Sequence, residues 1–178
     1  MRVIAGEFRS RRLKSIPGIA TRPTPDRLRE TLFDILMPRL KGATFLDAYA
    51  GTGAVGIEAL SRGARHAYFL ERNRLALEAI RENLASLELE RRATVLSGPV
   101  LRSLPGCHVD IVFLDPPYEQ DREYGAALEA LSEGMASLVV VQHSVRLAMP
   151  DAVGVLRRAR LVRQGDNALS FYEGESSR

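Results

Sequence analysis

The sequence has little cysteine and no long apolar run. Cys107 is its one cysteine, so an internal disulfide is excluded and a cysteine-based metal site is not expected. No stretch of about 18 or more apolar residues occurs, so no segment is expected to span a membrane. Residues 1–10 have charges among their apolar residues and lack the apolar core of a secretory signal. These absences favour a protein of the reducing cytoplasm.

Charge is unevenly distributed along the chain. The 178 residues are 46% hydrophobic and 26% charged, which suits one globular domain over residues 1–178. Residues 1–41 hold ten Lys or Arg and four acids, whereas residues 42–178 hold 15 and 18. A basic arm, residues 1–22, on a mildly acidic body is typical of proteins that hold a polyanion at one end. A nucleic-acid partner and a merely solvated hairpin are both compatible with this pattern.

Strands and helices are expected to alternate along the body of the chain. Residues 1–5 and 11–14 flank Gly6 and predict a small hairpin. Thr24 is expected to cap a helix that starts at Pro25 and ends between Pro38 and Gly42. Further strands are predicted over 43–47, 66–71, 93–96, 109–115, 137–141, 153–162 and 168–172, with helices over 55–62, after Asn73, near Leu101 and around Leu128.

This alternation, closed by an antiparallel pair, predicts an α/β fold. We expect a Rossmann-like, doubly wound and mostly parallel sheet of seven strands, with an N-terminal β-hairpin and helix extension. The strand over 109–115 is almost wholly apolar, as expected in the middle of a parallel sheet.

A glycine-rich turn follows the first predicted strand. Gly51, Gly53 and Gly56 allow the backbone to turn sharply and to approach a ligand closely. The turn lies at the carboxyl end of a strand, where open α/β sheets bind ligands. Glu71 ends the next strand and can accept hydrogen bonds from both hydroxyls of a ribose. Because the same spacing also satisfies the dinucleotide fingerprint, a nicotinamide-dependent oxidoreductase is an alternative.

Asp47 favours a different ligand for this turn. It ends the strand four residues before Gly51, where a carboxylate suits the amino or sulfonium end of a cationic methionine moiety. The same carboxylate would repel a pyrophosphate. Tyr49 and Ala50 also make the turn longer than a tight diphosphate loop needs. The turn therefore predicts S-adenosylmethionine as its ligand, and a glycine turn without a ligand is the less favoured alternative.

A second turn, Asp115-Pro116-Pro117-Tyr118, follows the most apolar strand directly. Its two prolines fix two φ angles and make it rigid. The Asp115 carboxylate and the Pro116 carbonyl can accept both N–H bonds of an exocyclic amino group, and Tyr118 can stack on its base. A base must leave its stack to reach such a group. The turn predicts methyl transfer to an exocyclic amine, and the alternative is a stiff surface turn.

Together these two turns resemble those of Rossmann-like amino-methyltransferases, in which Asp/Asn-Pro-Pro-Tyr/Phe marks the methyl acceptor site. The chain further resembles the 16S rRNA guanine-N2 methyltransferase family over nearly its whole length, including the N-terminal hairpin. The segments that resemble that family are Arg22-Pro-Thr24-x-Asp-Arg27-x-Arg29-Glu30 with Leu32-Phe33, Leu46-Asp47-x-Tyr-Ala-Gly51-Thr-Gly53, Glu58-Ala-Leu-Ser-Arg-Gly63-Ala, and Gly165-Asp-x-Ala-Leu-Ser-Phe-Tyr172.

The resemblance implies a cytoplasmic, monomeric enzyme that methylates a guanine N2 of 16S rRNA in the assembling small subunit, with no membrane partner. It implies S-adenosylmethionine as donor, S-adenosylhomocysteine as product and no metal. The catalytic residues would be Asp115, Pro116, Pro117 and Tyr118. The cofactor site would contain Asp47, Tyr49, Gly51, Gly53, Glu71, Arg72, Pro99, Val100 and Asp115. RNA contacts are expected from Arg9, Arg11, Arg12, Lys14, Arg22 and Arg27.

Two positions depart from the family pattern. Pro99 stands where members usually have an acid or Asn against the adenine amino group, so that contact would come from the backbone or Ser97. Gln142 stands where members usually have Glu, which weakens the case for proton handling there. His143 is interpreted as a structural rather than a catalytic histidine. The sequence is also compatible with methylation of adenine N6 in RNA or DNA, with methylation of a protein amide, and with a non-catalytic RNA-binding module.

Overall fold

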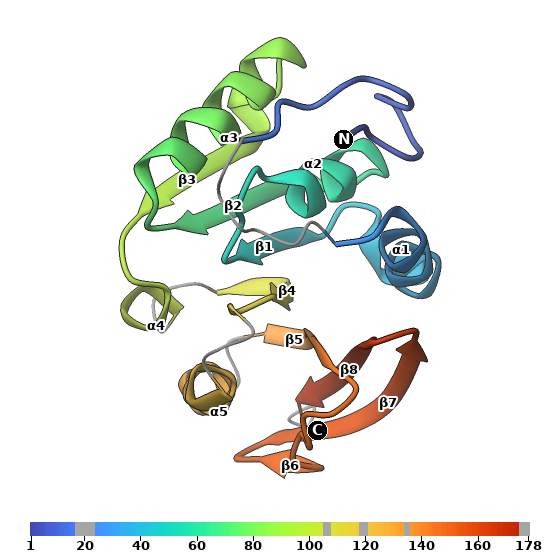
Figure 1. Cartoon of the computed structure of the whole chain (residues 1–178), viewed down its shortest axis with the longest axis vertical. Helices are drawn as coiled ribbons and strands as arrows, with labels where there is room; N and C mark the ends of the chain where they lie inside the picture. Colours follow the sequence, from blue (N-terminus) through green and yellow to red (C-terminus); the bar gives the residue numbers. More distant parts are fainter. Residues whose placement is uncertain (17–23, 105–107, 118–120, 134–135, 175–178) are drawn as a thin grey trace.

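The fold is built on one mixed sheet of eight strands. The computed structural model describes residues 1–16, 24–104, 108–117, 121–133 and 136–174. Within them the strand order is β3-β2-β1-β4-β5-β8-β7-β6, as Figure 1 shows. The first five strands run parallel and the last three are antiparallel. Their bounds are β1 Thr44–Ala48, β2 His66–Glu71, β3 Ala93–Ser97, β4 Val109–Leu114, β5 Ala136–Ser144, β6 Ala152–Val153, β7 Leu156–Gln164 and β8 Asn167–Gly174.

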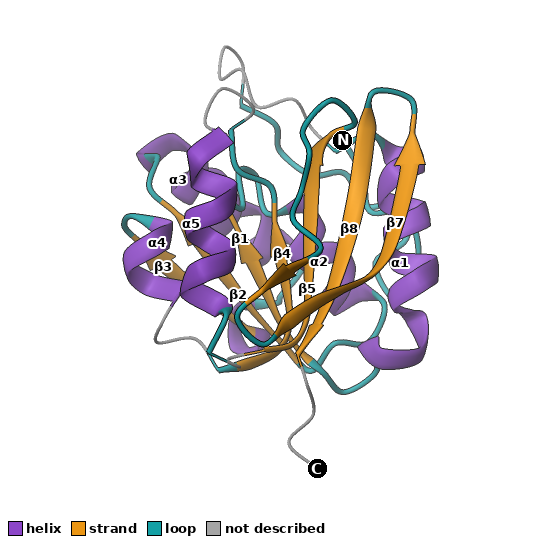
Figure 2. Ribbon diagram, turned by 90° about the horizontal axis from the view of Figure 1, so that it is seen from below, coloured by secondary structure: helices purple, strands orange, loops and turns teal. Residues whose placement is uncertain are grey.

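Helices cover both faces of the sheet. They are α1 (Asp26–Leu40), α2 (Ala54–Ser61), α3 (Arg74–Ser86), the 3-10 turn η1 (Glu90–Arg92), α4 (Val100–Ser103) and α5 (Asp121–Leu131). Two of the three apolar clusters join α1, α2 and α3 to one face, and the third joins α4 and α5 to the other. Figure 2 shows α1 beside the β5–β8–β7 end of the sheet, away from α4 and α5. None of the described helices has the length and apolarity needed to cross a membrane.

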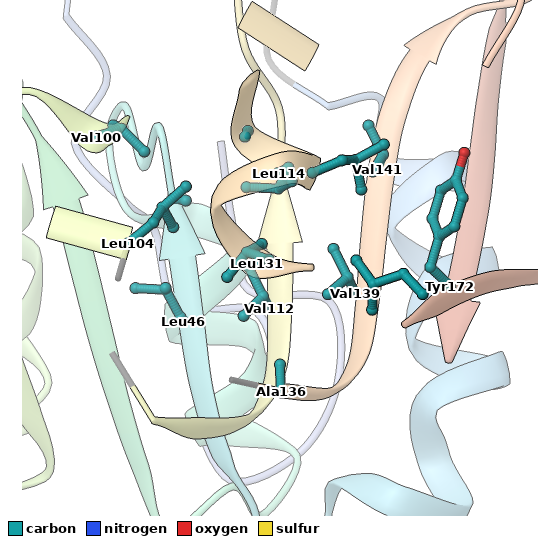
Figure 3. Packing of buried hydrophobic residues seen from close by; sticks show 14 of the residues in the cluster. Leu46, Val100, Leu104, Val112, Leu114, Leu131, Ala136, Val139, Val141 and Tyr172 are labelled. Carbon is teal, nitrogen blue, oxygen red and sulfur yellow. The ribbon is translucent and has the colours of Figure 1, made fainter. Parts of the chain in front are cut away.

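The apolar runs of the central strands form the core. In Figure 3, Val112 and Leu114 of β4 pack with Val139 and Val141 of β5 around Leu131 of α5. Burial of such side chains is the main favourable contribution to folding. The predicted doubly wound α/β fold is confirmed, including the cap at Asn73, whose side chain accepts a hydrogen bond from the Ala76 N–H at 3.1 Å.

An eighth strand was not predicted. The prediction of one strand over 153–162 is wrong at its start, because Gly154 has φ +55° and opens a tight turn between β6 and β7. A Cβ at Gly154 would also lie 2.5 Å from the Ser132 Cβ, so the turn packs closely against the end of α5. A local backbone conformation that only glycine adopts easily thus divides the predicted strand.

The start and end of α1 also differ from the prediction. Pro25, not Thr24, is the N-cap, and no side chain caps the helix. Thr24 instead donates its hydroxyl to the Gln142 side-chain oxygen at 3.0 Å. Pro38 lies inside the last turn and does not end the helix, which continues to Leu40. Burial of Leu36 and Leu40 against the sheet outweighs the proline's missing hydrogen bond.

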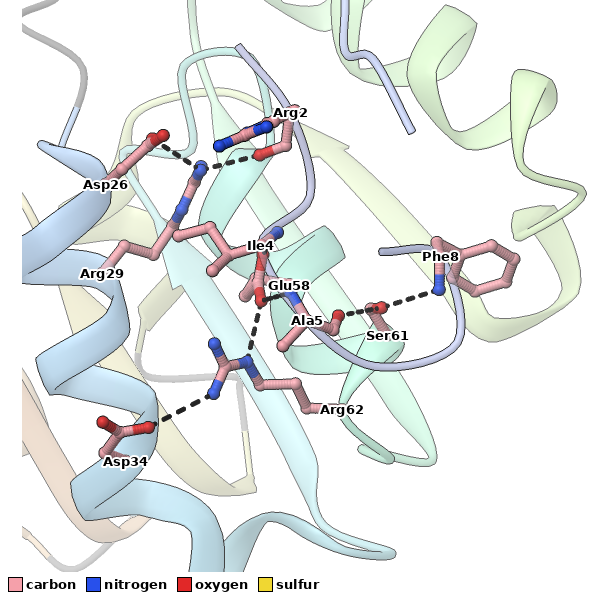
Figure 4. Close-up of polar contacts among 10 residues, drawn as sticks. All are labelled: Arg2, Ile4, Ala5, Phe8, Asp26, Arg29, Asp34, Glu58, Ser61 and Arg62. Carbon is pink, nitrogen blue, oxygen red and sulfur yellow. Dashed lines mark hydrogen bonds and ion pairs between the residues drawn. The ribbon is translucent and has the colours of Figure 1, made fainter. Parts of the chain in front are cut away.

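The N-terminal arm is a short antiparallel hairpin without regular strands. Arg2 and Arg12 form an isolated antiparallel bridge, and the N–H groups of Val3 and Leu13 donate to the carbonyls of Arg11 and Met1 at 2.9 and 3.0 Å. Figure 4 shows that α2 also holds the arm. The buried Glu58 carboxylate accepts the N–H groups of Ile4 and Ala5 at 2.8 and 2.9 Å. The predicted β-hairpin is therefore confirmed, although its two segments form one bridge rather than regular strands.

Two arginines balance the buried charge of Glu58. Arg62 donates its Nε to Glu58 at 2.7 Å, and the Arg29 guanidinium is fully buried nearby. Arg29 also donates to the Arg2 carbonyl at 2.8 Å and to Asp26 at 3.0 Å. A buried charge is tolerable only when it is paired in this way. The network joins the arm, α1 and α2 into one unit.

Gly6 provides a test of how closely the arm must approach α2. Its φ is +85°, and an added Cβ would lie 2.0 Å from the Ser61 carbonyl oxygen. Gly42 has a similar φ of +76° but nothing within 4 Å of an added Cβ. We predict that Gly42→Ala loses about 1–2 kcal/mol of unfolding free energy through backbone strain alone. Gly6→Ala should lose about 1–3 kcal/mol more through overpacking. Urea denaturation measures both, and equal losses would contradict the close approach.

Candidate active site

Two turns meet where the strand order reverses. The chain runs from β1 outward to β3 and then returns to β4 beside β1, and ligands of open α/β sheets bind at such a point. Ala48 of β1 pairs with Leu114 of β4, so the next residues of both strands leave the sheet at one edge. We name residues 49–53 the glycine turn and residues 115–117 the proline turn. The structure thus brings the two predicted turns together.

Asp47 lies buried beneath the glycine turn. Its side chain is 2% exposed and accepts a hydrogen bond from the Gly56 N–H at 2.8 Å, in the first turn of α2. Burial raises the pKa of Asp47 well above its usual value, although the Gly56 hydrogen bond favours the charged form. The neighbouring carboxylates of Asp115 and Glu71 raise this pKa further. A negative charge on Asp47 is therefore unfavourable in this structure.

Asp115 has a similarly perturbed carboxyl group. The residue keeps some solvent exposure, but the surrounding protein removes enough water to raise its pKa to about 7. Among the described residues, no lysine or arginine forms an ion pair with Asp47, Glu71 or Asp115. The site therefore holds acidic groups whose charged forms a cationic ligand would stabilise.

The Glu71 carboxylate is more fully occupied than the sequence suggests. One oxygen accepts the Gly51 N–H at 2.9 Å, and the other accepts the N–H groups of Arg72 and Asn73, each at 2.8 Å. A carboxylate has about four acceptor positions, so one remains, on the oxygen that holds Gly51. Glu71 therefore shapes the glycine turn itself, and its predicted contact with a ribose stays a prediction.

The glycine turn has an unusual backbone. Gly51 and Gly53 have φ of +56° and +79°, and Tyr49 has φ +65°, which is strained for a residue with a side chain. The Tyr49 hydroxyl donates to Glu123 of α5 at 2.8 Å, and this bond holds the strained residue in place. Burial and the bond to Glu123 raise the pKa of Tyr49. Helix α5 thus supports the turn from the far side of the sheet.

Gly56 is needed for the packing of α2 rather than for a ligand. A Cβ at this position would lie 2.4 Å from the Phe69 ring of β2. This is the role of the third glycine in nucleotide-binding turns, where the helix must pack closely on the strand.

Asn83 of α3 joins the glycine turn to the N-terminal arm. Its buried amide donates to the Thr52 carbonyl at 3.0 Å and accepts the Lys14 N–H at 2.7 Å. Sequence reasoning did not identify Asn83, because both of its partners are backbone atoms of distant segments. Side chains that bond to backbone leave no pattern in the sequence of their partners.

Tyr124 of α5 holds the proline turn. Its buried hydroxyl donates to the Pro116 carbonyl at 3.2 Å. The carbonyl predicted to bind an amino group therefore already has one partner, and its second lone pair remains available. Pro116 is buried and Pro117 exposed, whereas Tyr118 lies outside the described residues. Adjacent residues of α5, Glu123 and Tyr124, thus hold both turns, and sequence reasoning missed both residues.

The other predicted cofactor residues lie at the same edge. The Gly98 N–H donates to the Glu71 carbonyl at 3.1 Å and ties the end of β3 to that of β2. Pro99 follows as the exposed N-cap of α4, and Val100 is buried in its first turn. Arg72 is exposed and contacts Glu71 through its own N–H.

His143 fits its interpretation as a structural residue. It is 3% exposed, and its Nδ1 lies 2.8 Å from the Ser144 carbonyl oxygen. Because that oxygen can only accept, Nδ1 donates, and Nε2 accepts the Ser170 hydroxyl at 2.8 Å in the neutral ring. Burial lowers the pKa of His143, so the neutral form is favoured.

The predicted RNA-contacting residues are largely exposed, but two of them already have partners. Arg11 donates to the Ser86 carbonyl at 3.0 Å, and Lys14 pairs with Glu82 at 2.5 Å. Arg22 lies outside the described residues. The other exposed members of the set are Arg9, Arg12 and Arg27.

Comparisons with known proteins agree with this architecture. A family model described as conserved hypothetical protein 95 matches residues 1–173. The chain is 34% identical over 182 residues to "Putative rRNA methyltransferase YlbH" of Bacillus subtilis, across 97% of this chain and 98% of that one. Ribosomal RNA small subunit methyltransferase D of Escherichia coli K12 is 40% identical over 121 residues, or 67% and 61% of the two chains.

A solved structure named "Putative methyltransferase yhhF from Escherichia coli" superposes with a TM-score of 0.87, at 33% identity and with 99% of each chain covered. This likeness extends over the N-terminal arm as well as the sheet. The fold predicted from the sequence is therefore that of a solved methyltransferase-like chain. Because the family model matches nearly the whole length of this chain, the chain belongs to the conserved hypothetical protein 95 family.

Proposed function

We propose that this protein is an S-adenosylmethionine-dependent methyltransferase that acts on the exocyclic N2 of a guanine in 16S rRNA. The observation that supports this most strongly is the convergence of Asp47 and Asp115 beside two turns, without a cationic partner among the described residues. The relatives named as rRNA methyltransferases support the same reaction class and an rRNA substrate. We expect a cytoplasmic monomer that works during assembly of the small subunit.

The residues at this edge fit a cationic cofactor. S-adenosylmethionine, when bound, supplies a methyl group on a sulfonium and leaves as a neutral sulfide. Asp47 would hold its charged end, Glu71 its ribose, and Gly51, Gly53, Pro99 and Val100 would line the site. The raised pKa values of Asp47 and Asp115 indicate that added negative charge is unfavourable there. A dinucleotide pyrophosphate would add such charge, which argues against an oxidoreductase.

The proline turn suits an amino group as the methyl acceptor. The Asp115 carboxylate and the second lone pair of the Pro116 carbonyl can accept the two N–H bonds of an exocyclic amine. Those two bonds fix the nitrogen in position, and positioning provides a large part of the rate in such transfers. With a pKa of about 7, Asp115 can hold the proton that the amine gives up. Exposed Arg9, Arg12 and Arg27 are proposed to contact RNA phosphates.

The test is methyl transfer from labelled S-adenosylmethionine to 16S rRNA, free and in partly assembled subunits, followed by mass analysis of the nucleosides. We expect N2-methylguanosine at one position. Asp115→Ala should abolish transfer, because it removes one of the two acceptors, while cofactor affinity by calorimetry stays within about tenfold. A folded, cofactor-binding protein that labels no rRNA would disprove the proposal. N6-methyladenosine as the product would show that the target base is adenine rather than guanine. Tighter binding of NADH than of S-adenosylmethionine would indicate an oxidoreductase instead of a methyltransferase.

Tyr124 offers a sharper test of the proline turn. Tyr124→Phe removes the hydroxyl that donates to the Pro116 carbonyl, so we expect kcat to fall about three- to tenfold, as the loss of one such bond implies. The KM values for cofactor and RNA should change less than about twofold. Tyr172→Phe is a matched control, because Tyr172 is also buried and donates to a proline carbonyl, that of Pro150, at 2.7 Å.

The control should lose stability but keep kcat. Equal effects of the two substitutions on kcat would mean that Tyr124 acts only through stability. Thermal unfolding of both variants separates this outcome from a positioning role.

A further inference from the structure

A second basic region lies far from the N-terminal arm in the sequence. Residues 146–163 contain five arginines and one acid, Asp151, although residues 42–178 as a whole are mildly acidic. The arginines are Arg146, Arg157, Arg158, Arg160 and Arg163. Four of them lie on β7, and Arg146 lies in the segment that follows β5. Arg157 donates to the Gly154 and Leu156 carbonyls and Arg158 to the Met149 carbonyl, so only part of this charge serves the fold.

Strand register places part of this region at the edge that holds the proline turn. Arg163 pairs with Ala168 of β8, and Ala168 pairs with His143 near the carboxyl end of β5. Val145, directly before Arg146, donates its N–H to the Asp166 carbonyl at 3.0 Å, in the turn between β7 and β8. Arg146 and Arg163 are therefore at the carboxyl edge. β7 is three strands from β4, which corresponds to about 15 Å.

A cavity of about 290 Å³ lies within this region. Three arginines, Arg146, Arg158 and Arg163, line it together with His143, Leu161 and Met149, and none of its lining residues is acidic. Arg158 pairs with Asp151 and donates to the Met149 carbonyl at 3.1 Å. Arg146 and Arg163 are exposed and form no ion pair with any described acid.

This arrangement suits phosphate groups. Guanidinium groups bind phosphate oxygens through paired N–H donors, and here two of the three lack a competing carboxylate. His143 adds no charge to this surface, because its neutral ring is bonded to Ser144 and Ser170. Leu161 and Met149 provide apolar surface that favours electrostatic contacts by excluding water.

We propose that this β7 surface, defined by Arg146, Arg158 and Arg163, binds the phosphodiester backbone of the RNA substrate beside its target base. The inference rests on the proposed function. In Figure 1 the N-terminal arm and β7 lie at opposite ends of the molecule, with β1 and β4 between them. RNA that contacts both would pass over the strands that carry the two turns. The contacts are to phosphate, so they add affinity and orientation rather than base choice.

The test is a salt series of RNA binding by the full chain and the double variant Arg146→Glu/Arg163→Glu. The matched control is Arg65→Glu/Arg91→Glu, which changes net charge equally at two exposed positions before β2 and β3, at the opposite edge of the sheet. A 16S rRNA fragment that the wild type methylates serves as the probe. Cofactor affinity is measured by calorimetry with S-adenosylhomocysteine.

We expect the double variant to bind the fragment at least about tenfold more weakly in moderate salt. The slope of log K against log salt should become shallower by about 1.4–1.8, the value for two lost phosphate contacts. Its KM for RNA should rise and its cofactor affinity should stay within about twofold. The control should keep both the affinity and the slope of the wild type. Arg146→Ala/Arg163→Ala, which avoids new negative charge, should show the same loss of slope if the Glu variant unfolds.

An unchanged slope and affinity in a wild-type-like fold would overturn the inference and leave the proposed function intact. An equal loss in the control would also overturn it, because net charge alone would then explain the effect. A wild type that binds and methylates no rRNA would instead disprove the proposed function. If the double variant loses binding to a protein but keeps its binding to RNA, the surface serves a different partner and the inference is overturned.

Discussion

Because β1 and β4 pair in parallel, two carboxyl groups lie at the same edge of the sheet, where little water reaches them. Asp47 and Asp115 come from the ends of these neighbouring strands, and burial raises the pKa of both. One backbone N–H of α2, from Gly56, offsets part of this cost, and the described residues supply no ion pair. Since an unpaired buried charge is unfavourable, both carboxyl groups favour their neutral forms, and the proposed cationic ligand would stabilise their charged forms.

The remainder of the site consists of side chains that hold backbone. Glu71 holds Gly51, Asn83 holds Thr52, and Tyr124 holds the Pro116 carbonyl. These supports come from β2, α3 and α5, so elements on both faces of the sheet fix the position of the two turns. The N-terminal arm belongs to the same framework, because Asn83 also bonds to the backbone of Lys14. A substitution far from the edge can therefore displace the turns without touching a ligand.

Sequence patterns predicted the features that depend on local chemistry. The apolar strands, the Asn73 cap and both turns follow from residue type and spacing, and the structure confirms them. Apart from the local turn at Gly154, the failures depend on partners distant in the chain. Thr24 bonds to Gln142 instead of capping α1, and Tyr124 cannot be recognised before α5 is seen to face the proline turn. The arginines of β7 are visible in the sequence, but the charge count over residues 42–178 as a whole is mildly acidic and conceals them.

Proton release on cofactor binding tests most directly whether the carboxyl groups of Asp47 and Asp115 bind a cation. At about pH 6.5 the amino group of S-adenosylmethionine is already protonated, whereas much of Asp115, with a pKa of about 7, is still neutral. A cation beside Asp115 lowers that pKa, so protons should leave on binding. Calorimetry in two buffers of different ionisation enthalpy should show net release, reduced in Asp115→Asn. Binding without release, or equal release by the variant, would contradict the central role given to these two groups.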